Sequence, residues 1–237
     1  MDKSKWKKAE QHLLRQFQRR LHQYANVIPE VDDTLEWLAL MQHHGAPTRL
    51  LDWTRSPFVA VYFAVENATA GCASSVWIVN RQAMHNRTLD KMPDLLDAIT
   101  ASQNEALSDK AIFNKFLFDG EVTTVVAVEP FRMNERLTVQ QGLFLLPTNV
   151  RETFIDNLNG ATSFANTPTP HLYKIELELS DKARLIILEE LRKMNIHRAS
   201  LFPGIDGFAQ SLATEIEIWG SFDEERLLLD GSYNEYF

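Results

Sequence analysis

One short segment of the chain, QHHGAPTRLLDWT from Gln42 to Thr54, holds most of the side chains that could do chemistry. Apolar residues surround the segment, so these groups should be desolvated and each should need a partner. Amide, imidazole, guanidinium, carboxylate and hydroxyl groups can bind a ligand or satisfy one another inside a fold. The residues are Gln42, His43, His44, Arg49, Asp52, Trp53 and Thr54.

A purely structural interpretation explains part of this segment. Arg49 and Asp52 could form an internal ion pair, while Thr54 and Asp52 could accept hydrogen bonds from the open N–H groups of a following helix. This interpretation leaves Gln42 and the two histidines unexplained. A ligand site in the same segment therefore stands beside it as a second hypothesis.

Several other kinds of site lack support in the sequence. His43 and His44 are neighbours, so they do not suit one metal ion, and no further ligands follow at a familiar spacing. Cys72 is the single cysteine, which leaves no disulfide and no cysteine-based metal centre. The chain has no G-x-S-x-G, P-loop or G-x-G-x-x-G motif. We expect no metal site.

The turn after Trp53 is predicted to place these groups between a strand and a helix. A buried extended stretch should begin at Leu50 and end by Trp53, and Ser56 should cap a helix whose first residue is Pro57. The sequence of that helix, FVAVYFAV, is apolar on nearly every side, which predicts deep burial.

Four other helices follow from periodicity and capping residues. They cover residues 6–24, a segment from 34 to about 44 after Asp32-Asp33, 181–194, and 204–219 with Asp206 as a cap. The range 83–120 also favours helix. The apolar stripe of the first helix, expected to face the core, is Trp6, Ala9, Leu13, Phe17 and Leu21.

Short apolar runs predict the strands. Residues 74–80 and 123–129 read as buried strands, 171–178 as a half-exposed strand, and 136–148 as a strand interrupted at Gly142 by a bulge or a close approach. The range 159–170 is predicted to be a mobile loop. Strands scattered among helices favour an α+β fold, and we expect a single domain with a mixed sheet and several packing helices.

Bulk composition limits the partners and the location. The net charge of −8, from 24 basic and 32 acidic residues, argues against a nucleic-acid partner, and the basic residues between Lys3 and Arg20 read as a solvated helix face. No apolar run is long enough to cross a membrane, and no secretory signal precedes the first helix. We expect a cytoplasmic protein with no membrane contact.

The central segment, QHHGAPTRLLDWTRSPFVAVYFA, resembles the core of the bacterial FRG domain. NERLTVQQGLF (134–144) and NIHRASLFPGIDGFAQSL (195–212) are also similar to that family, so the resemblance implies one FRG domain over 1–237. The family's F/Y-R-G motif belongs on a first strand that this chain lacks. The nearest match, Phe131-Arg132-Met133, lies elsewhere in the order, and we expect the chain to begin just after the motif.

Two elements are also similar to those of the ADP-ribosyltransferases. One resembles their hydroxyl-bearing strand and the helix that follows it, DWTRSPFVAVYFA. The other resembles the strand that carries their catalytic glutamate, VQQGLFLLP. This likeness implies an ADP-ribosyltransferase-like fold. It implies that Thr54, or Ser56, bonds the ribose, and that Gln140 and Gln141 stand where the catalytic glutamate is expected, with Gln141 as the catalytic residue. The residues it implies for substrate contacts are Gln42, His43, His44, Arg49 at a phosphate, Trp53 or Tyr62 stacked on nicotinamide, and Gln140.

The resemblance implies NAD as a substrate, with no tightly bound cofactor, and transfer or hydrolysis of ADP-ribose, as in a toxin or a phage-defence effector. Cleavage builds positive charge on the ribose, which a carboxylate stabilises and an amide does not. Catalysis by this chain should then be feeble, or Asp52 or a later acid must supply the charge. Glu215 and Glu217 form an E-x-E pair that is interpreted as surface residues. The alternative is a non-catalytic module that binds a nucleotide-like molecule or a protein partner, so enzyme activity is left open.

Overall fold

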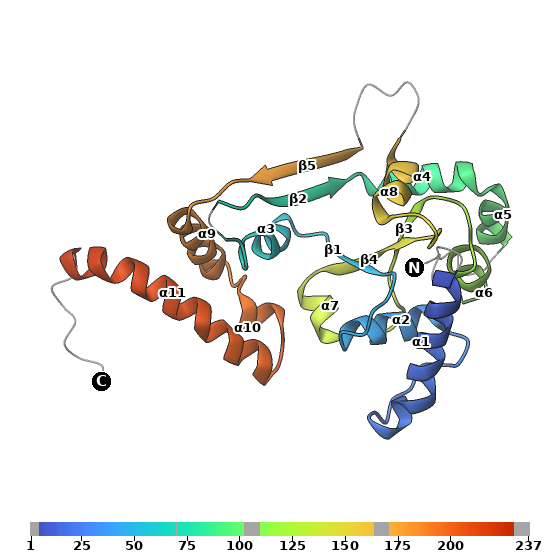
Figure 1. Ribbon diagram of the computed structural model, residues 1–237, viewed down its shortest axis with the longest axis horizontal. Helices are drawn as coiled ribbons and strands as arrows, with labels where there is room; N and C mark the ends of the chain where they lie inside the picture. Colours follow the sequence, from blue (N-terminus) through green and yellow to red (C-terminus); the bar gives the residue numbers. More distant parts are fainter. Residues whose placement is uncertain (1–4, 70, 102–109, 164–170, 230–237) are drawn as a thin grey trace. The chain divides into compact units, whose positions relative to one another are not determined.

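The computed structural model describes residues 5–69, 71–101, 110–163 and 171–229. Helices and strands alternate irregularly along the chain, and the strands form a three-stranded sheet of order β1-β4-β3 and a two-stranded sheet of β2 and β5 (Figure 1). This mixed architecture confirms the predicted α+β class. The likeness to ADP-ribosyltransferases at the level of fold stays a prediction.

The chain divides into two compact units. Unit 1 comprises Met1–Trp53, Ile78–Met133 and Leu143–Tyr173, and unit 2 comprises Thr54–Trp77, Asn134–Gly142 and Lys174–Phe237. The elements wholly or mostly in unit 1 are α1 (Trp6–Arg20), a 3-10 turn (Leu21–Gln23), α2 (Thr34–His43), β1 (Leu51–Thr54), α4 (Arg81–Lys91), α5 (Pro93–Ala101), α6 (Lys110–Ile112), a π-helical turn (Phe113–Phe118), β3 (Val125–Val128), β4 (Gly142–Pro147) and α8 (Phe154–Thr162). Those of unit 2 are α3 (Pro57–Val65), β2 (Ser74–Val79), α7 (Glu135–Val139), β5 (Leu172–Leu177), α9 (Asp181–Lys193), α10 (Arg198–Leu201) and α11 (Ile205–Leu229).

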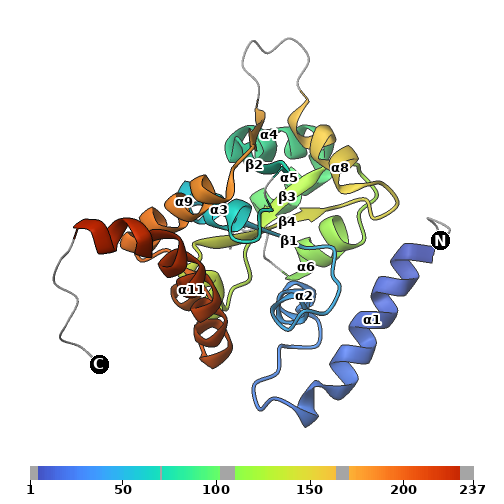
Figure 2. The ribbon, with the colours of Figure 1, turned by 60° about the vertical axis from the view of Figure 1, so that its left-hand side comes forward.

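In unit 1, β4 is the central strand of its sheet. It pairs antiparallel with β3, and the register sets Val125 opposite Pro147 and Val128 opposite Phe144. Every residue of β4 is buried, as expected for a central strand covered on both faces. Helices α4 and α8 pack against β3, and α1 packs beside α2 (Figure 2).

In unit 2, α3 and α9 form the centre of a helical core. Val59, Tyr62 and Val65 on α3 pack with Leu185 and Leu188 on α9, and α11 and α10 complete the cluster. The capping predicted for α3 is confirmed: the Ser56 hydroxyl accepts a hydrogen bond from the Val59 N–H (3.4 Å), and Pro57 is the first helical residue. The local turn is therefore encoded by its own residues.

Burial differs from the sequence-based expectation in three helices and strands. Helix α3 is not buried all round, because Phe58 and Phe63 are exposed while the Val59 face packs inward. Strand β2 is buried only at Val76. In α1 the inward residue is Leu14, whereas Trp6 and Leu13 are exposed. An apolar residue type alone does not identify the packed face, since much of a folded surface is apolar.

The segment 136–148 is not one interrupted strand. Residues 135–139 form α7, whose N-terminus is capped by the Asn134 side chain, and β4 begins only at Gly142. A Cβ on Gly142 would lie 2.5 Å from Leu137 Cδ1, so the predicted close approach is confirmed and the bulge is wrong. The predicted loop 159–170 is also wrong at its start, where α8 continues to Thr162; residues 164–170 lie outside the described residues.

No helix in the described part of the chain is long and apolar enough to span a membrane.

Candidate functional site

Three polar residues of unit 1 form a small hydrogen-bonded network around Asp52. Thr48 Oγ1 donates to Gln42 Oε1 (2.7 Å), and Gln42 Nε2 donates to Asp52 Oδ2 (3.3 Å). The Leu50 N–H donates to Thr48 Oγ1 (3.2 Å), which fixes the turn before β1. The network leaves the Asp52 side chain exposed and held in place by Gln42.

Arg49 does not pair with Asp52. Its Nε donates to Glu10 Oε1 (2.7 Å) and its Nη2 contacts Glu10 Oε2, so the pair is bidentate, and the guanidinium also lies 4.7 Å from the ring centroid of Phe118. The side chains of Arg49 and Glu10 are 4% and 14% exposed. The expected local ion pair is wrong because a carboxylate on α1 reaches the guanidinium and excludes water from it.

The two histidines and Trp53 have different surroundings within unit 1. The rings of His43 and His44 meet edge to face with centroids 4.9 Å apart. Trp53 is half-buried and packs against the core around Met84 and Leu145. Among the residues the structure describes, no group of three His, Cys, Asp or Glu side chains could hold a metal ion.

In unit 2, two segments far apart in sequence are joined at the start of α3. Thr54 Oγ1 donates to the Gln140 carbonyl oxygen (2.7 Å), across 86 residues, and accepts from the Ser56 N–H (3.0 Å). The Arg55 N–H donates to the Gln141 carbonyl oxygen (3.0 Å). Thr54 and Arg55 are thus fastened to the Q-Q-G segment within unit 2.

The two glutamines of this junction differ in role. Gln140 is buried, and its Nε2 donates to the Leu201 carbonyl oxygen (2.9 Å), which ties α7 to α10. Gln141 is exposed and has a φ of 49°, one of the positive values that only glycine adopts without strain. The fold therefore presents the Gln141 amide to solvent from a strained backbone position.

Two guanidinium groups lie near this junction in unit 2. Arg136 and Arg198 both lie over the ring of Phe202, at 4.7 and 4.6 Å from its centroid. Arg136 stands one helical turn before Gln140, and no described carboxylate pairs with it. Arg136 and Gln140 are four residues apart and therefore lie on the same face of α7. The junction thus has a guanidinium group beside the side chain that bonds to α10.

Tyr62 is part of the unit 2 core and is 2% exposed. Its hydroxyl donates to Glu66 Oε1 (2.7 Å), and Arg198 binds the same oxygen. Burial, reinforced by the hydrogen bond to Glu66 and its charge, raises the pKa of the Tyr62 hydroxyl far above its ordinary value. The adjoining cavity of about 20 Å³ has room for about one water molecule and not for a nicotinamide ring.

The raised pKa of Tyr62 makes a testable contribution to stability. In the unfolded chain the hydroxyl ionises near pH 10, whereas in the fold it stays protonated, so the contribution is complete below pH 10 and falls as the pH rises further. Between pH 10 and 11 the wild-type chain should lose about 1 kcal/mol more stability than Tyr62→Phe. Denaturant unfolding of both proteins at pH 7, 10 and 11 measures the difference; parallel losses would contradict this assignment.

The structure brings the candidate residues together in two groups. Gln42 and Asp52 meet in unit 1, and Thr54, Gln140 and Gln141 meet in unit 2. Glu215 and Glu217 are exposed on α11, as predicted. The sequence-based predictions did not include four residues that take part in these contacts: Thr48, Glu10, Glu66 and Arg136. Only Glu10 had a visible indication, since it is the one acid within the basic stretch of α1.

The geometry defines a mixed α and β protein with one group of polar candidate residues in unit 1 and another in unit 2. Residues 1–72 match the family model of the FRG domain, which confirms the FRG resemblance over the part of the chain that contains Gln42–Asn67. The similar stretches at 134–144 and 195–212 lie outside the match. No curated protein and no solved structure matches the chain.

Proposed function

We propose that the junction of Thr54 and Arg55 with Gln140 and Gln141 is the base of a NAD-binding site on an ADP-ribosyltransferase-like fold. One observation carries the proposal: hydrogen bonds join these two segments across 86 residues. They are the two segments whose sequences are similar to the hydroxyl-bearing and glutamate-bearing elements of ADP-ribosyltransferases. The two segments resemble ADP-ribosyltransferase elements independently of each other, so their contact in the fold supports the proposal more than either resemblance alone.

Each residue of the junction has a distinct part in this proposal. The exposed Gln141 amide binds a ribose hydroxyl, and Thr54 is a positioning residue whose hydroxyl holds the Q-Q-G segment. Arg136 supplies a cation for the pyrophosphate, because a guanidinium binds phosphate oxygens in a bidentate manner. The backbone of Gln141 supports the assignment, since strained non-glycine conformations of about 1–3 kcal/mol gather at ligand sites.

The same chemistry limits the reaction. Cleavage of the nicotinamide–ribose bond develops positive charge on the sugar, and the Gln141 amide offers a dipole but no charge. The proposed activity is therefore binding of NAD with slow cleavage, and a charge from Asp52 stays a prediction. Slow transfer or hydrolysis of ADP-ribose is the activity that a toxin or phage-defence role would draw upon.

Replacing Gln141 by glycine should separate binding from stability. Glycine adopts a φ of 49° freely, so Gln141→Gly should stabilise the fold by up to about 1 kcal/mol. The same change removes the amide and should weaken NAD binding by about tenfold, which corresponds to about 1.4 kcal/mol. Isothermal titration calorimetry with NAD and denaturant unfolding measure the two effects.

Asn195→Gly is the matched control, because Asn195 also lies in unit 2 with a positive φ of 60°. It should leave NAD affinity unchanged and stabilise the fold less than Gln141→Gly, because asparagine tolerates a positive φ and its Oδ1 lies 3.2 Å from His197 Nε2. Release of nicotinamide from NAD tests cleavage in the same samples. Absence of both NAD binding and NAD-induced thermal stabilisation in the full chain would refute the proposal, and unchanged affinity in Gln141→Gly would refute the role of the amide.

A further inference from the structure

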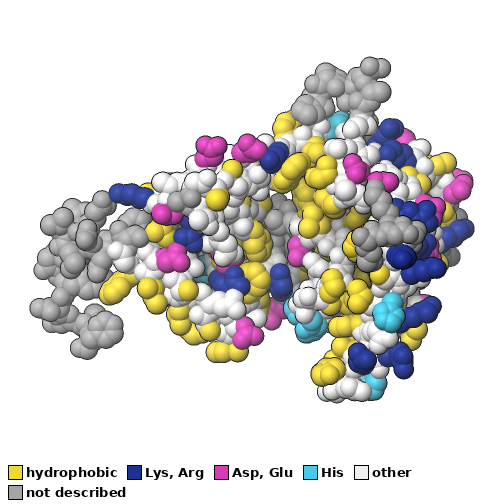
Figure 3. Space-filling model, viewed as in Figure 1, with side chains coloured by type: hydrophobic (Ala, Val, Ile, Leu, Met, Phe, Trp, Pro, Cys, Tyr) yellow, Lys and Arg dark blue, Asp and Glu magenta, His cyan; other side chains and the backbone are white. Residues whose placement is uncertain are grey.

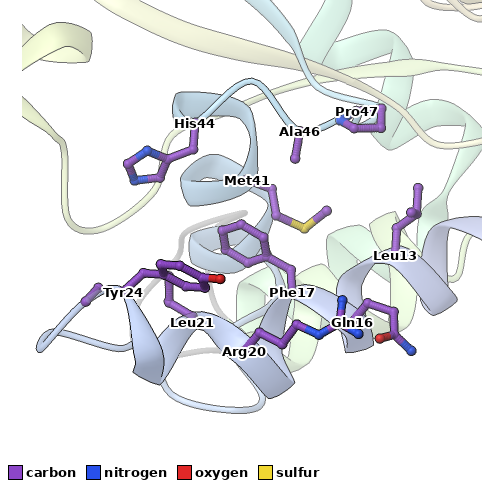
Figure 4. A pocket seen from close by; sticks show the side chains of 11 residues that line it. Leu13, Gln16, Phe17, Arg20, Leu21, Tyr24, Met41, His44, Ala46 and Pro47 are labelled. Carbon is purple, nitrogen blue, oxygen red and sulfur yellow. The ribbon is translucent and has the colours of Figure 1, made fainter.

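Unit 1 contains an apolar groove of about 520 Å³ between α1 and the end of α2 (Figure 4). Phe17 and Met41 face each other across it, and Leu21 lies at its base. Its volume falls within the roughly 300–1,000 Å³ that is typical of ligand-binding pockets. Its lining is mostly apolar, with Gln16, Arg20 and His44 as polar lining residues, which suits an apolar occupant better than a nucleotide.

Arg20 is the one arginine or lysine among the residues that line the groove. Arg15, Arg19 and Lys8 are exposed on the opposite face of α1, since residues of an α-helix follow one another at about 100°. The acid of this helix, Glu10, is turned inward to Arg49. An acid on the flank of an occupant would therefore meet the positive charge of Arg20.

Helix α11 in unit 2 has a second apolar face in addition to the one that packs on its neighbours. Gly207, Ser211 and Ile218 are buried, and a Cβ on Gly207 would lie 1.8 Å from the Phe202 carbonyl oxygen, so this inner face packs closely. The outer face is exposed, and hydrophobic side chains follow α11 in Figure 3. The outer residues, at successive intervals of three and four, are Ile205, Phe208, Leu212, Ile216 and Trp219.

The outer face of α11 complements the groove in charge and length. Of the three acids between Ile205 and Gly220, Glu215 borders the apolar row, three residues after Leu212 and four before Trp219, while Glu217 binds Arg184; the range contains no lysine or arginine. The apolar row spans about 21 Å at 1.5 Å per residue, and the groove wall from Leu13 to Tyr24 spans about 17 Å. An exposed apolar row of this size commonly marks an interaction surface.

We propose that α11 of one copy of this chain docks by its outer face into the α1–α2 groove of a second copy. This is recognition of an amphipathic helix by an apolar groove, with Glu215 of α11 beside Arg20 of α1. Pairing of α11 with itself would oppose acid to acid, and pairing of two grooves would oppose base to base. The mixed contact is the arrangement of these two surfaces that matches charge.

Two single variants of the full chain test the contact. Leu212→Lys alters the outer face of α11, and Leu13→Lys alters the groove. Sedimentation equilibrium over a concentration series should show self-association of the wild-type chain, weakened at least about tenfold in either variant, as at a central interface residue. Leu212→Lys keeps the groove intact, and Leu13→Lys keeps the outer face of α11 intact. In a mixture, α11 of the Leu13→Lys chain can dock into the groove of the Leu212→Lys chain, so association should return although neither variant associates alone.

Ile155→Lys is the matched control, because Ile155 on α8 is exposed to a similar degree as Leu212, at 46% and 42%. It should associate like the wild type, and circular dichroism checks that all variants fold. A charge exchange adds a second readout: Glu215→Lys and Arg20→Glu should each weaken association, and their mixture should recover it.

Three results would overturn the proposal. The wild-type chain could remain a monomer at all concentrations. Leu212→Lys could dissociate the protein while Leu13→Lys does not, which would mean that α11 pairs with itself. Both variants could change the shape of a monomer without any dependence on concentration, which would place α11 in the groove of its own chain.

Discussion

Arg49→Ala is expected to destabilise unit 1 by about 3–5 kcal/mol, because it removes one partner of a nearly buried bidentate ion pair and leaves the Glu10 carboxylate without its cation. The change also removes a guanidinium that lies over Phe118 and donates to the Pro147 carbonyl oxygen (3.5 Å). Denaturant unfolding followed by circular dichroism measures the loss. Helix α1 should lose its anchor first, since Glu10 is the point at which Arg49 holds it.

Asp52→Ala separates this interpretation from a local Arg49–Asp52 pair. Asp52 is exposed and its bond from Gln42 is long at 3.3 Å, so its removal should cost less than about 0.5 kcal/mol. The double variant Glu10→Leu with Arg49→Met should recover much of the loss, because an apolar pair can replace a buried ion pair. Equal losses for Arg49→Ala and Asp52→Ala would contradict the assignment of Glu10 as the partner.

Helix caps and short strands, which depend on residues adjacent in the sequence, could be predicted from residue types and their spacing. Asp33 caps α2 by accepting from the Glu36 N–H, and Ser56 caps α3, both as their residue types indicated. The strands at 74–79 and 125–128 followed from short β-branched runs. A cap or a short strand is encoded within a few residues, so one sequence is enough to find it.

The error at 135–139 is also a local one and could have been avoided. Asn134 followed by Glu135 is a helix start, and the Asn134 side chain accepts from the Leu137 N–H (2.8 Å). The β-branched residues of the segment outweighed this cap in the sequence reading. Tertiary contacts favour the helix, because Gln140 at its end reaches the Leu201 carbonyl oxygen.

The parts that sequence could not give are pairings between distant residues. Nothing near Arg49 points to Glu10, 39 residues away, and nothing near Glu66 points to Arg198, 132 residues away. The side chain of Gln140 was assigned to a ligand, yet its amide holds α10 inside unit 2. A buried polar group must have a partner, but its type says nothing about which one. Within the candidate site, the two segments could therefore be located from the sequence. Only the structure shows that Gln141 is exposed while Gln140 is buried in a contact with Leu201.

Glu66→Ala should destabilise unit 2 by about 3 kcal/mol, at the lower end for a broken buried pair because Arg198 remains 23% exposed. Glu66 is buried at the end of α3, and one of its carboxylate oxygens binds both the Tyr62 hydroxyl and the Arg198 guanidinium. Alanine would leave a buried hydroxyl without an acceptor as well as a cation without its counter-ion. Glu66→Gln should cost less, about 1–2 kcal/mol, since the amide oxygen can still accept from Tyr62.

Glu217→Ala provides the comparison, because Glu217 also binds an arginine of unit 2, Arg184, at 2.7 Å. Its side chain is 50% exposed, so solvent screens the pair and removal should cost less than about 1 kcal/mol. Arg184 keeps its bond to the Val65 carbonyl oxygen (3.0 Å) in that variant. Denaturant unfolding of the three variants should therefore rank Glu66→Ala above Glu66→Gln above Glu217→Ala. A loss in Glu66→Ala no larger than in Glu217→Ala would mean that the Tyr62–Glu66–Arg198 cluster does not stabilise the core of unit 2.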